Sequence, residues 1–340
     1  MRGGGDHSYG GLETLINTWT VAGYVSYLCG VPLRMPLLRT VSPRGPFMQH
    51  AQCVPDVFQK AGFAQKVVSG VDLGFAGTGN LFFTHGVRVH DLLYFQQQNK
   101  LPQTLKRVDI GHVFFFGARN AGVVLPKDVQ GVGNWGVNDK TLFQLAKEEF
   151  LEMKRAQKPF VFYLLTMDTH GEPFEKENTS CPDLPNTRIG TYQCADRLIS
   201  DFVDFVLQNS TNTSIVILGD HSPVVKMNED ETQKVPFALA EEEFNVLRDT
   251  QTDSQFFAPI YNVFIHPHFA QTAHKNKTFS RKLTHFDVAP LLLESVGIRA
   301  DAFALGRNPL RFQTLLEKDY PKEAFRAEIT RRSRFYNDFW

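Results

Sequence analysis

Short, mainly apolar runs that alternate with longer amphipathic stretches constrain the fold of this chain most strongly. The runs 159–165, 214–218 and 259–265 are nearly continuous in apolar residues, as expected for strands that are covered on both faces of a sheet. A shorter run at 66–69 is a further expected strand. Apolar residues at helical spacing predict helices over the stretches 54–61, 140–156, 192–208 and 287–296. This alternation predicts an α/β fold.

The composition is that of a globular chain and excludes two classes of protein. Apolar residues make up 42% of the 340 positions and charged residues 21%, whereas a disordered chain would be poorer in apolar residues and more charged. Lys plus Arg and Asp plus Glu each number 36, so the formal net charge is zero. Without an excess of positive charge, no nucleic acid is expected among the partners.

Signals for membrane insertion and secretion are not found within the sequence. No run reaches the roughly 18 to 20 apolar residues that cross a bilayer. The first residues, 1–7, lack the apolar region of a secretory signal. The sequence by itself therefore predicts neither a membrane span nor a leader within these residues.

Four cysteines fall into two pairs that are close in the sequence, Cys29 with Cys53 and Cys181 with Cys194. No C-x-x-C spacing occurs, so they indicate neither a zinc ribbon nor a thioredoxin-type motif. They are either four unrelated buried thiols or two short disulfide loops. Each loop would stabilise the fold by about 3 kcal/mol and would place the domain in an oxidising compartment.

Two expected strands end in polar clusters, 166–171 and 219–223. In open α/β sheets, ligands bind at the carboxyl ends of the strands. The second cluster contains Asp220 and His221, a carboxylate and an imidazole that suit zinc or manganese. A helix-capping Asp beside a surface His would have the same sequence. His170 in the first cluster favours the metal interpretation, because two strand-end histidines could converge on one cleft.

Thr20 is a further candidate, because it lies at the start of an expected helix. The backbone N–H groups and the dipole at a helix N-terminus favour anions, and a metal-bound Thr hydroxyl there can act as a nucleophile. The alternative is a simple N-cap, the commonest role of Thr before a helix.

Seven segments form a combined pattern: 18–23, 29–33, 70–77, 134–136, 168–170, 219–221 and 304–307. Together they resemble the phosphoglycerol transferase I family of the sulfatase and alkaline phosphatase superfamily, whose relatives include lipoteichoic acid synthases and phosphoethanolamine transferases. All four cysteines fall where the family has them. The resemblance implies a three-layer α/β/α fold with a mixed, mostly parallel sheet. It divides the chain into an irregular N-terminal remnant (1–18), a sulfatase-like catalytic domain (19–310) and a C-terminal appendage (311–340).

The resemblance also implies a site and a reaction. By this resemblance, Thr20 corresponds to the nucleophile and is also a metal ligand. Asp220 and His221 correspond to metal ligands. His170 corresponds to a histidine that steadies the phosphate or the leaving oxygen. One divalent cation is implied, manganese or zinc, with magnesium as a further option. By analogy, the substrate-binding residues are Asp72, Trp135 and Arg307, although a structural salt bridge is the simpler role for Arg307.

The implied reaction is a phosphoglycerol transfer from a phosphatidylglycerol-like donor to a glycan hydroxyl or to water. The implied location is the periplasm, the cell exterior or a secretory lumen, with membrane anchors in the full-length protein. One feature departs from the family, whose first metal ligand is a Glu at the end of a strand well upstream of the nucleophile. Only 19 residues precede Thr20, and Glu13 lies too close to it to match. We therefore expect either a fragment lacking the first strand or weak metal binding.

Three alternatives stay open on the sequence. A sulfatase would use C-x-P-x-R with a formylglycine, but the spacing after Cys29 is one residue too long, which favours a structural cysteine. A phosphodiesterase or phosphatase on the same fold would use water as the acceptor. A non-catalytic, sulfatase-like binding domain would explain the missing Glu.

Overall fold

A computed structural model describes the expected sheet and the helices around it. The described residues are 11–12, 20–33, 45–103, 132–133, 136–170, 180–185, 187–221, 262–265, 282–318 and 322–330. Trp135 and Glu13 lie outside these ranges, so their predicted roles are not addressed by the structure.

The strands at the centre are mainly parallel. Strand β2 (Ala64–Ser69) pairs in parallel with β3 (Arg88–His90) on one side and with β6 (Phe160–Leu165) on the other. Strand β7 (Ile215–Leu218) pairs antiparallel with β8 (Asn262–Ile265). The mixed, mostly parallel sheet is therefore present as a three-stranded parallel sheet and an antiparallel pair within the described residues.

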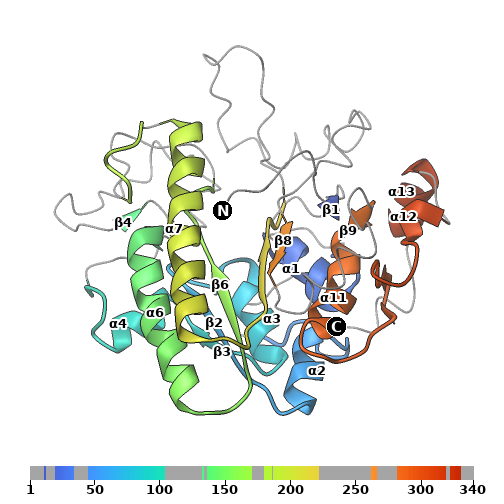
Figure 1. The fold of residues 1–340 in the computed structure, drawn as a ribbon, viewed down its shortest axis with the longest axis horizontal. Coiled ribbons are helices and arrows are strands. Elements are labelled where there is room, and N and C mark those ends of the chain that lie inside the picture. The colour runs from blue at the N-terminus through green and yellow to red at the C-terminus, as the bar shows by residue number, and fades with distance from the viewer. Residues whose placement is uncertain are drawn as a thin grey trace.

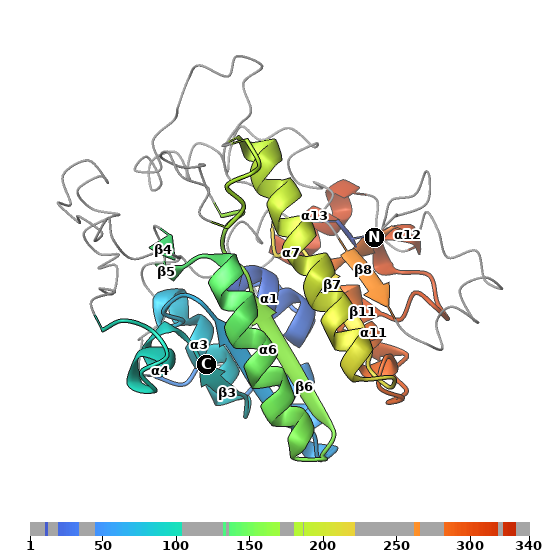
Figure 2. The ribbon, with the colours of Figure 1, turned by 60° about the vertical axis from the view of Figure 1, so that its left-hand side comes forward.

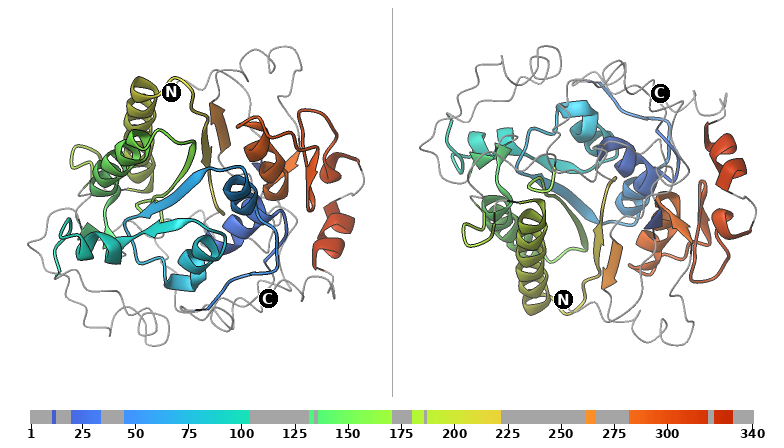
Figure 3. Two further views of the ribbon diagram at one scale, coloured as in Figure 1. Left: turned by 90° about the horizontal axis from the view of Figure 1, so that it is seen from below. Right: turned by 90° about the horizontal axis from the view of Figure 1, so that it is seen from above.

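Helices cover the strands from two sides, which gives the three layers that the resemblance implied (Figure 3). Helices α6 (Asp139–Arg155) and α7 (Arg188–Asn209) lie side by side on one face (Figures 1 and 2). The opposite layer contains α1 (Thr20–Cys29), α3 (Thr78–Thr84) and α11 (Val288–Glu294).

Side-chain alternation along β2 and β6 explains this layering. Val67 packs with the α1 side of the molecule, whereas its neighbour Val68 packs with α6. In β6, Tyr163 and Leu165 contact the first cluster, whereas Phe162 and Leu164 contact the second. Because successive strand residues point to opposite faces, the continuous apolar runs supply two cores at once.

Smaller elements complete the described chain. They are β1 (Gly11–Leu12), α2 (Val54–Lys60), the 3₁₀ turn η1 (Phe75–Gly77), α4 (Leu92–Gln97), β4 (Val132–Gly133), β5 (Gly136–Val137), β9 (Leu283–Thr284), the 3₁₀ turn η3 (His285–Asp287), β10 (Ala302–Phe303), β11 (Gly306–Arg307), α12 (Leu315–Lys318) and α13 (Lys322–Thr330). β1 pairs in parallel with β9, and Phe325 of α13 contacts Phe286 of η3 at 6.4 Å between ring centres. The division into 1–18, 19–310 and 311–340 stays a prediction.

The strands differ in how far their residues are buried. The residues of β6, β7 and β8 are only partly buried, whereas Gln65 to Ser69 of β2 are buried. In the described part of the chain, β6 pairs only with β2, and β7 pairs only with β8. Within the described ranges each of them thus has a strand neighbour on one side only, and a strand in that position is less covered than a central one.

Both predicted disulfides are present. Cys29–Cys53 has an S–S distance of 2.01 Å and ties the end of α1 to the start of α2. Cys181–Cys194 has an S–S distance of 2.03 Å and ties the segment 180–185 to α7. A disulfide at Cys29 excludes formylglycine at this position, as the C-x-x-P-x-R spacing indicated.

None of the described helices has the combination of length and apolarity that crossing a membrane requires.

A buried charge cluster joins β2 to α6. Nζ of Lys66, which is fully buried, lies 2.6 Å from Oε2 of Glu149, whose side chain is 1% exposed. His90 Nδ1 lies 2.8 Å from the same oxygen, and Lys100 lies 3.2 Å from the other. Burial alone would raise the pKa of Glu149, but the hydrogen bonds from His90, Lys66 and Lys100 hold it well below its usual range. The charged form of Glu149 therefore stabilises the folded state.

The substitution Glu149→Gln tests this cluster. It leaves the ammonium of Lys66 buried beside a neutral side chain, and we expect a loss of about 3 kcal/mol in the free energy of unfolding at pH 7. Because the pKa of Glu149 is lowered on folding, its stabilisation is present above the ordinary value of 4.5 and is lost as the pH falls below it. The difference in the free energy of unfolding between wild type and Glu149→Gln should therefore shrink as the pH is lowered below 4.5, measured by denaturant titrations.

The control is Glu148→Gln, because Glu148 is exposed and, among the residues described, its ion pair is with Lys100 at 3.0 Å. We expect this control to change stability by less than about 1 kcal/mol. Equal effects of the two substitutions, or a difference independent of pH, would contradict the role of Glu149.

Candidate active site

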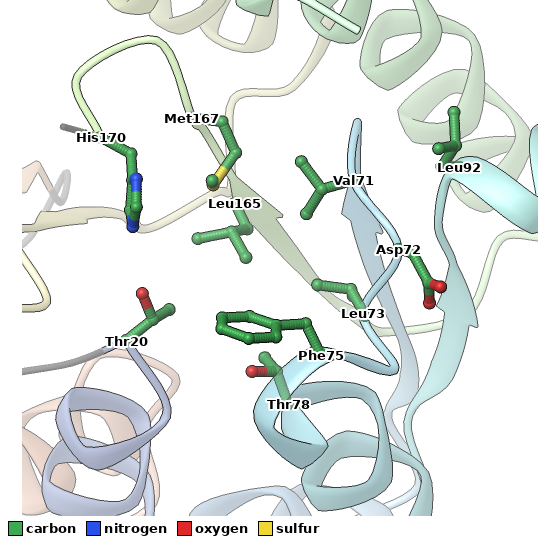
Figure 4. Close-up of a pocket in the computed structure, with 10 residues that line it drawn as sticks. All are labelled: Thr20, Val71, Asp72, Leu73, Phe75, Thr78, Leu92, Leu165, Met167 and His170. Atoms are coloured by element: carbon green, nitrogen blue, oxygen red, sulfur yellow. The ribbon is translucent and has the colours of Figure 1, made fainter. Parts of the chain in front are cut away.

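A cavity of about 50 Å³ lies at the edge where β2 and β6 end (Figure 4). Three residues that were predicted to act on substrate line it: Thr20, Asp72 and His170. Its apolar walls include Val71, Leu73, Phe75, Leu165 and Met167. The parallel pairing of β2 with β6 brings both carboxyl ends to this edge, where α/β folds bind their ligands.

Thr20 is the first residue of α1, as predicted. The nine residues that follow it in the helix are buried, so α1 is fixed in the core. Figure 4 shows the hydroxyl of Thr20 directed toward the ring of His170 across the cavity. The first turn contains no acidic residue, so no carboxylate of α1 itself competes for the N–H groups at this helix end.

Gly23 lets α1 touch the segment that follows β7. A Cβ atom at this position would lie 2.5 Å from the backbone oxygen of Asp220, closer than such atoms approach in proteins. The helix that carries Thr20 and the turn that carries the Asp-His pair are therefore in backbone contact. Asp220 also acts on the interior of α1, because its charge adds to burial in raising the pKa of Tyr24.

Asp220 and His221 present their donor atoms together. Oδ2 of Asp220 lies 3.5 Å from Nε2 of His221, and Oδ1 accepts a hydrogen bond of 2.9 Å from the backbone N–H of His221. Two donors that each lie about 2.1 Å from one tetrahedral zinc ion are separated by about 3.4 Å. The pair therefore fits two corners of a metal coordination sphere.

His170 lies in the electrostatic field of this pair. Burial lowers the pKa of His170, the charge of His221 lowers it further, and Asp220 opposes both effects. Its imidazole is consequently neutral at pH 7 and has one N–H to donate. The structure thus places the two predicted strand-end histidines in one neighbourhood.

His285 is a site residue that the sequence did not single out. Its Nε2 lies 3.4 Å from the backbone oxygen of Gly219, and its ring stacks on Tyr27 of α1 with the centres 6.2 Å apart. Burial lowers the pKa of His285 to about 4, so this imidazole is neutral as well. Its position directly after the short strand β9 repeats the pattern that marked His170 and His221, but β9 has only two residues and is not visible as an apolar run.

The remaining predicted residues differ in their positions. Asp72 lines the cavity, and its Oδ1 accepts a hydrogen bond of 2.8 Å from the N–H of Gly74. Arg307 belongs to β11, where its N–H donates to Asp287 Oδ1 at 2.8 Å, and it is not among the residues lining the cavity. A substrate-binding role for either residue stays a prediction.

The donor set for a metal is incomplete within the described ranges. No third His, Cys or carboxylate of this part of the chain joins Asp220 and His221 within 4.8 Å, so Thr20 is the remaining predicted ligand. The cluster of Cys29, Cys53 and His85 does meet that distance, but both of its sulfur atoms are bonded to each other in the disulfide. A thiolate is needed to bind a metal, so this cluster does not provide a metal site.

The contact at Gly23 gives a test of the site geometry. Gly→Ala inside a helix normally stabilises a protein by up to about 1 kcal/mol. Here we expect Gly23→Ala to destabilise by about 1 to 3 kcal/mol, because the methyl group would overlap the backbone of Asp220. The measurement is the free energy of unfolding in denaturant, and a gain in stability would show that α1 and the turn are not in contact.

The sequence matches the family described as Sulfatase over residues 17–298. A phosphoglycerol transferase I of Xanthomonas axonopodis pv. citri is 33% identical over 215 residues, which cover 60% of this chain and 27% of that protein. A phosphoglycerol transferase I of Citrobacter koseri is 26% identical over 212 residues, which cover 60% of this chain and 24% of that protein. The chain thus spans about a quarter of the length of these relatives.

Two solved structures have a similar fold. A protein of the alkaline phosphatase superfamily from Vibrio parahaemolyticus has a TM-score of 0.56 and 18% identity, with 91% of this chain and 63% of that one covered. The lipoteichoic acid synthase LtaP from Listeria monocytogenes has a TM-score of 0.53 and 15% identity, with 89% of this chain and 66% of that one covered. The fold is that of the alkaline phosphatase superfamily, as the resemblance implied. Because the family match extends over most of the residues, the chain belongs to the sulfatase family.

Proposed function

We propose that this domain is a phosphotransferase that moves a phosphoglycerol group from a phosphatidylglycerol-like donor to a glycan hydroxyl, with Thr20 as the nucleophile. The observation that carries the proposal is the position of Thr20, at the N-terminus of a buried helix and facing His170 across the cavity. The similarity to enzymes named phosphoglycerol transferase I supports the choice of reaction.

The reaction would proceed in two displacements. In the first, the oxygen of Thr20 forms a bond to phosphorus, the bond from phosphorus to the diacylglycerol oxygen breaks, and the proton of the hydroxyl passes to that leaving oxygen. In the second, the oxygen of the acceptor hydroxyl forms a bond to phosphorus, the bond from phosphorus to the Thr20 oxygen breaks, and the proton of the acceptor hydroxyl passes to the Thr20 oxygen. Two inversions give overall retention at phosphorus. Neutral His170 would donate a hydrogen bond to the phosphate or to the leaving oxygen.

Asp220, His221 and the oxygen of Thr20 are the proposed ligands of one divalent cation, manganese or zinc, with magnesium as a further option. The 3.5 Å separation of the Asp220 and His221 donor atoms supports this assignment. When bound, such a cation would offset negative charge on the phosphate and favour the ionised Thr20 hydroxyl. The other residues bind and orient: the α1 N-terminus offers N–H groups to the phosphate, and the apolar walls limit access of water.

The proposed setting follows from the disulfides and from the relatives. Two disulfides fit an oxidising compartment such as the periplasm, the cell exterior or a secretory lumen. A phospholipid donor would require contact with a membrane, and we propose membrane association for the full-length protein.

Two further candidate functions share the site. Water in place of the glycan would make the domain a phosphodiesterase or phosphatase, and a non-catalytic binding domain would fit the absence of a third His, Cys or carboxylate near Asp220 within the described ranges. Hydrolysis of a sulfuric ester has less support, because the sulfatase cysteine chemistry is not available at Cys29.

Substitution of Thr20 tests the nucleophile. We expect Thr20→Ala to lower kcat for a fluorescent phosphatidylglycerol donor by about 10³-fold or more, because the covalent intermediate cannot form. Thr20→Ser keeps a hydroxyl and should retain part of the activity. The control Thr78→Ala removes another hydroxyl from the cavity lining and should cause a much smaller loss. Equal activity of wild type and Thr20→Ala would rule out Thr20 as the nucleophile. Analysis of the products formed with and without a glycan acceptor separates transfer from hydrolysis.

Metal binding has its own test, which does not require activity. Mn²⁺ or Zn²⁺ at 100 times its dissociation constant should stabilise the folded protein by about 2.7 kcal/mol, measured as a shift of the melting temperature. We expect Asp220→Asn and His221→Ala to abolish the shift. The control His50→Ala changes an exposed histidine whose hydrogen bond is to its neighbour Gln49, and it should keep the shift. A wild-type protein that does not respond to Mn²⁺, Zn²⁺ or Mg²⁺ would favour the non-catalytic alternative.

A further inference from the structure

Two acidic residues outside the proposed chemistry form a reciprocal clamp beside the cavity. Asp139 is the first residue of α6 and is 1% exposed. Its Oδ1 accepts a hydrogen bond of 2.8 Å from the N–H of Met167, and its Oδ2 accepts one of 3.1 Å from the N–H of Asp168. In return, Oδ1 of Asp168 accepts the N–H of Asp139 at 3.1 Å. Each carboxylate thus binds the backbone of the segment that carries the other.

We propose that Asp139 and Asp168 are positioning residues that hold the turn 167–170 against the N-terminus of α6 and so fix His170 opposite Thr20. The proposal rests on the function proposed above.

The clamp acts on the turn that carries His170. The N–H of His170 donates to the backbone oxygen of Met167 at 2.9 Å, so the four residues 167–170 form one turn. Asp139 holds the first two N–H groups of this turn, and His170 and Met167 both line the cavity. A shift of the anchored end would therefore move the imidazole relative to Thr20.

The other end of the clamp is tied to α7. Ser180 Oγ donates to Oδ2 of Asp168 at 2.6 Å, and the next residue, Cys181, is bonded to Cys194 in α7. Helix α7 packs on α6 through Phe202 and Phe143, whose ring centres are 5.4 Å apart. The turn is consequently held between two packed helices, which is the rigid support that a catalytic geometry needs.

An ordinary helix cap does not account for two acids here. Asn138 already caps α6, because its side-chain oxygen accepts the N–H of Thr141 at 3.0 Å. Burial and the nearby Asp168 raise the pKa of Asp139, and burial also raises the pKa of Asp168. A buried carboxylate is unfavourable unless its oxygens are hydrogen-bonded, and these two have backbone N–H donors. An Asn at position 139 would turn one acceptor into a donor that faces another N–H group.

The test compares Asp139→Asn with Asn138→Ala, two adjacent substitutions at the start of the same helix. Asp139→Asn should speed hydrogen exchange of the Met167 and Asp168 amides by about tenfold, while the amides of β2 exchange as in wild type. It should also lower kcat by about tenfold and change KM by less than about twofold, because a displaced His170 affects the transition state more than substrate binding. Asn138→Ala should lower overall stability but leave these amides and kcat as in wild type.

The ring signals of ¹⁵N-labelled His170 give a readout that does not depend on turnover. They should shift in Asp139→Asn and in Asp168→Asn, and stay in place in Asn138→Ala.

Should wild type lack activity, the proposed function fails, whereas amide exchange and the His170 ring signals still decide whether the clamp exists. The proposal would be overturned if amide exchange and the His170 ring signals were unchanged in Asp139→Asn. An equal loss of kcat in Asp139→Asn and Asn138→Ala would also overturn it. If Asp139→Asn does not fold, Ser180→Ala removes the donor to Asp168 Oδ2 and the acceptor of the Lys140 N–H, and it should cause smaller changes of the same kind.

Discussion

The parallel pairing of β2 with β6 is the constraint on which the site depends. Six residue pairs set the register, from Ala64 opposite Phe160 to Ser69 opposite Leu165. Because both strands end together, the segments that follow them enter the same space, and Asp72 and His170 face one cavity. A slip of one residue would exchange the two faces of β6 and turn the side chains of Tyr163 and Leu165 away from α1. The buried pair of Lys66 and Glu149 separately fixes β2 against α6.

The Asp220–His221 pair and His285 are joined to the cavity through helix α1 and not through a strand. Gly23 brings the backbone of α1 against Asp220, and Tyr27 of the same helix stacks on His285. Helix α1 is anchored at its far end by the disulfide from Cys29 to Cys53. One buried helix thus connects Thr20, the Asp-His pair and His285, so changes in its interior are expected to reach the site.

The sequence predicted the parts of this arrangement that depend on local order. The apolar runs located β6 and β7, and the polar residues after them made His170, Asp220 and His221 the candidate site residues. The sequence could not pair the cysteines without the family resemblance, because spacing permits free thiols equally. It also could not identify His285 or Asp139. His285 follows a strand of only two residues, and the role of Asp139 depends on backbone N–H groups of residues 167 and 168, which are distant in the sequence. The degree of burial of β6 depends on what lies beside it in the sheet, and the apolar run 159–165 alone does not specify those neighbours.

The charges of the site bear on the proposed reaction. A phosphodiester donor is an anion, and Asp72 and Asp220 bring further carboxyl groups to its surroundings. His170 and His285 are neutral at pH 7, because burial lowers the pKa of each. The residues that line the described cavity include no Lys or Arg. The N–H groups at the α1 N-terminus would add about half a positive charge there. In the proposed transfer through Thr20, a cation on Asp220 and His221 would offset the negative charge of the phosphate.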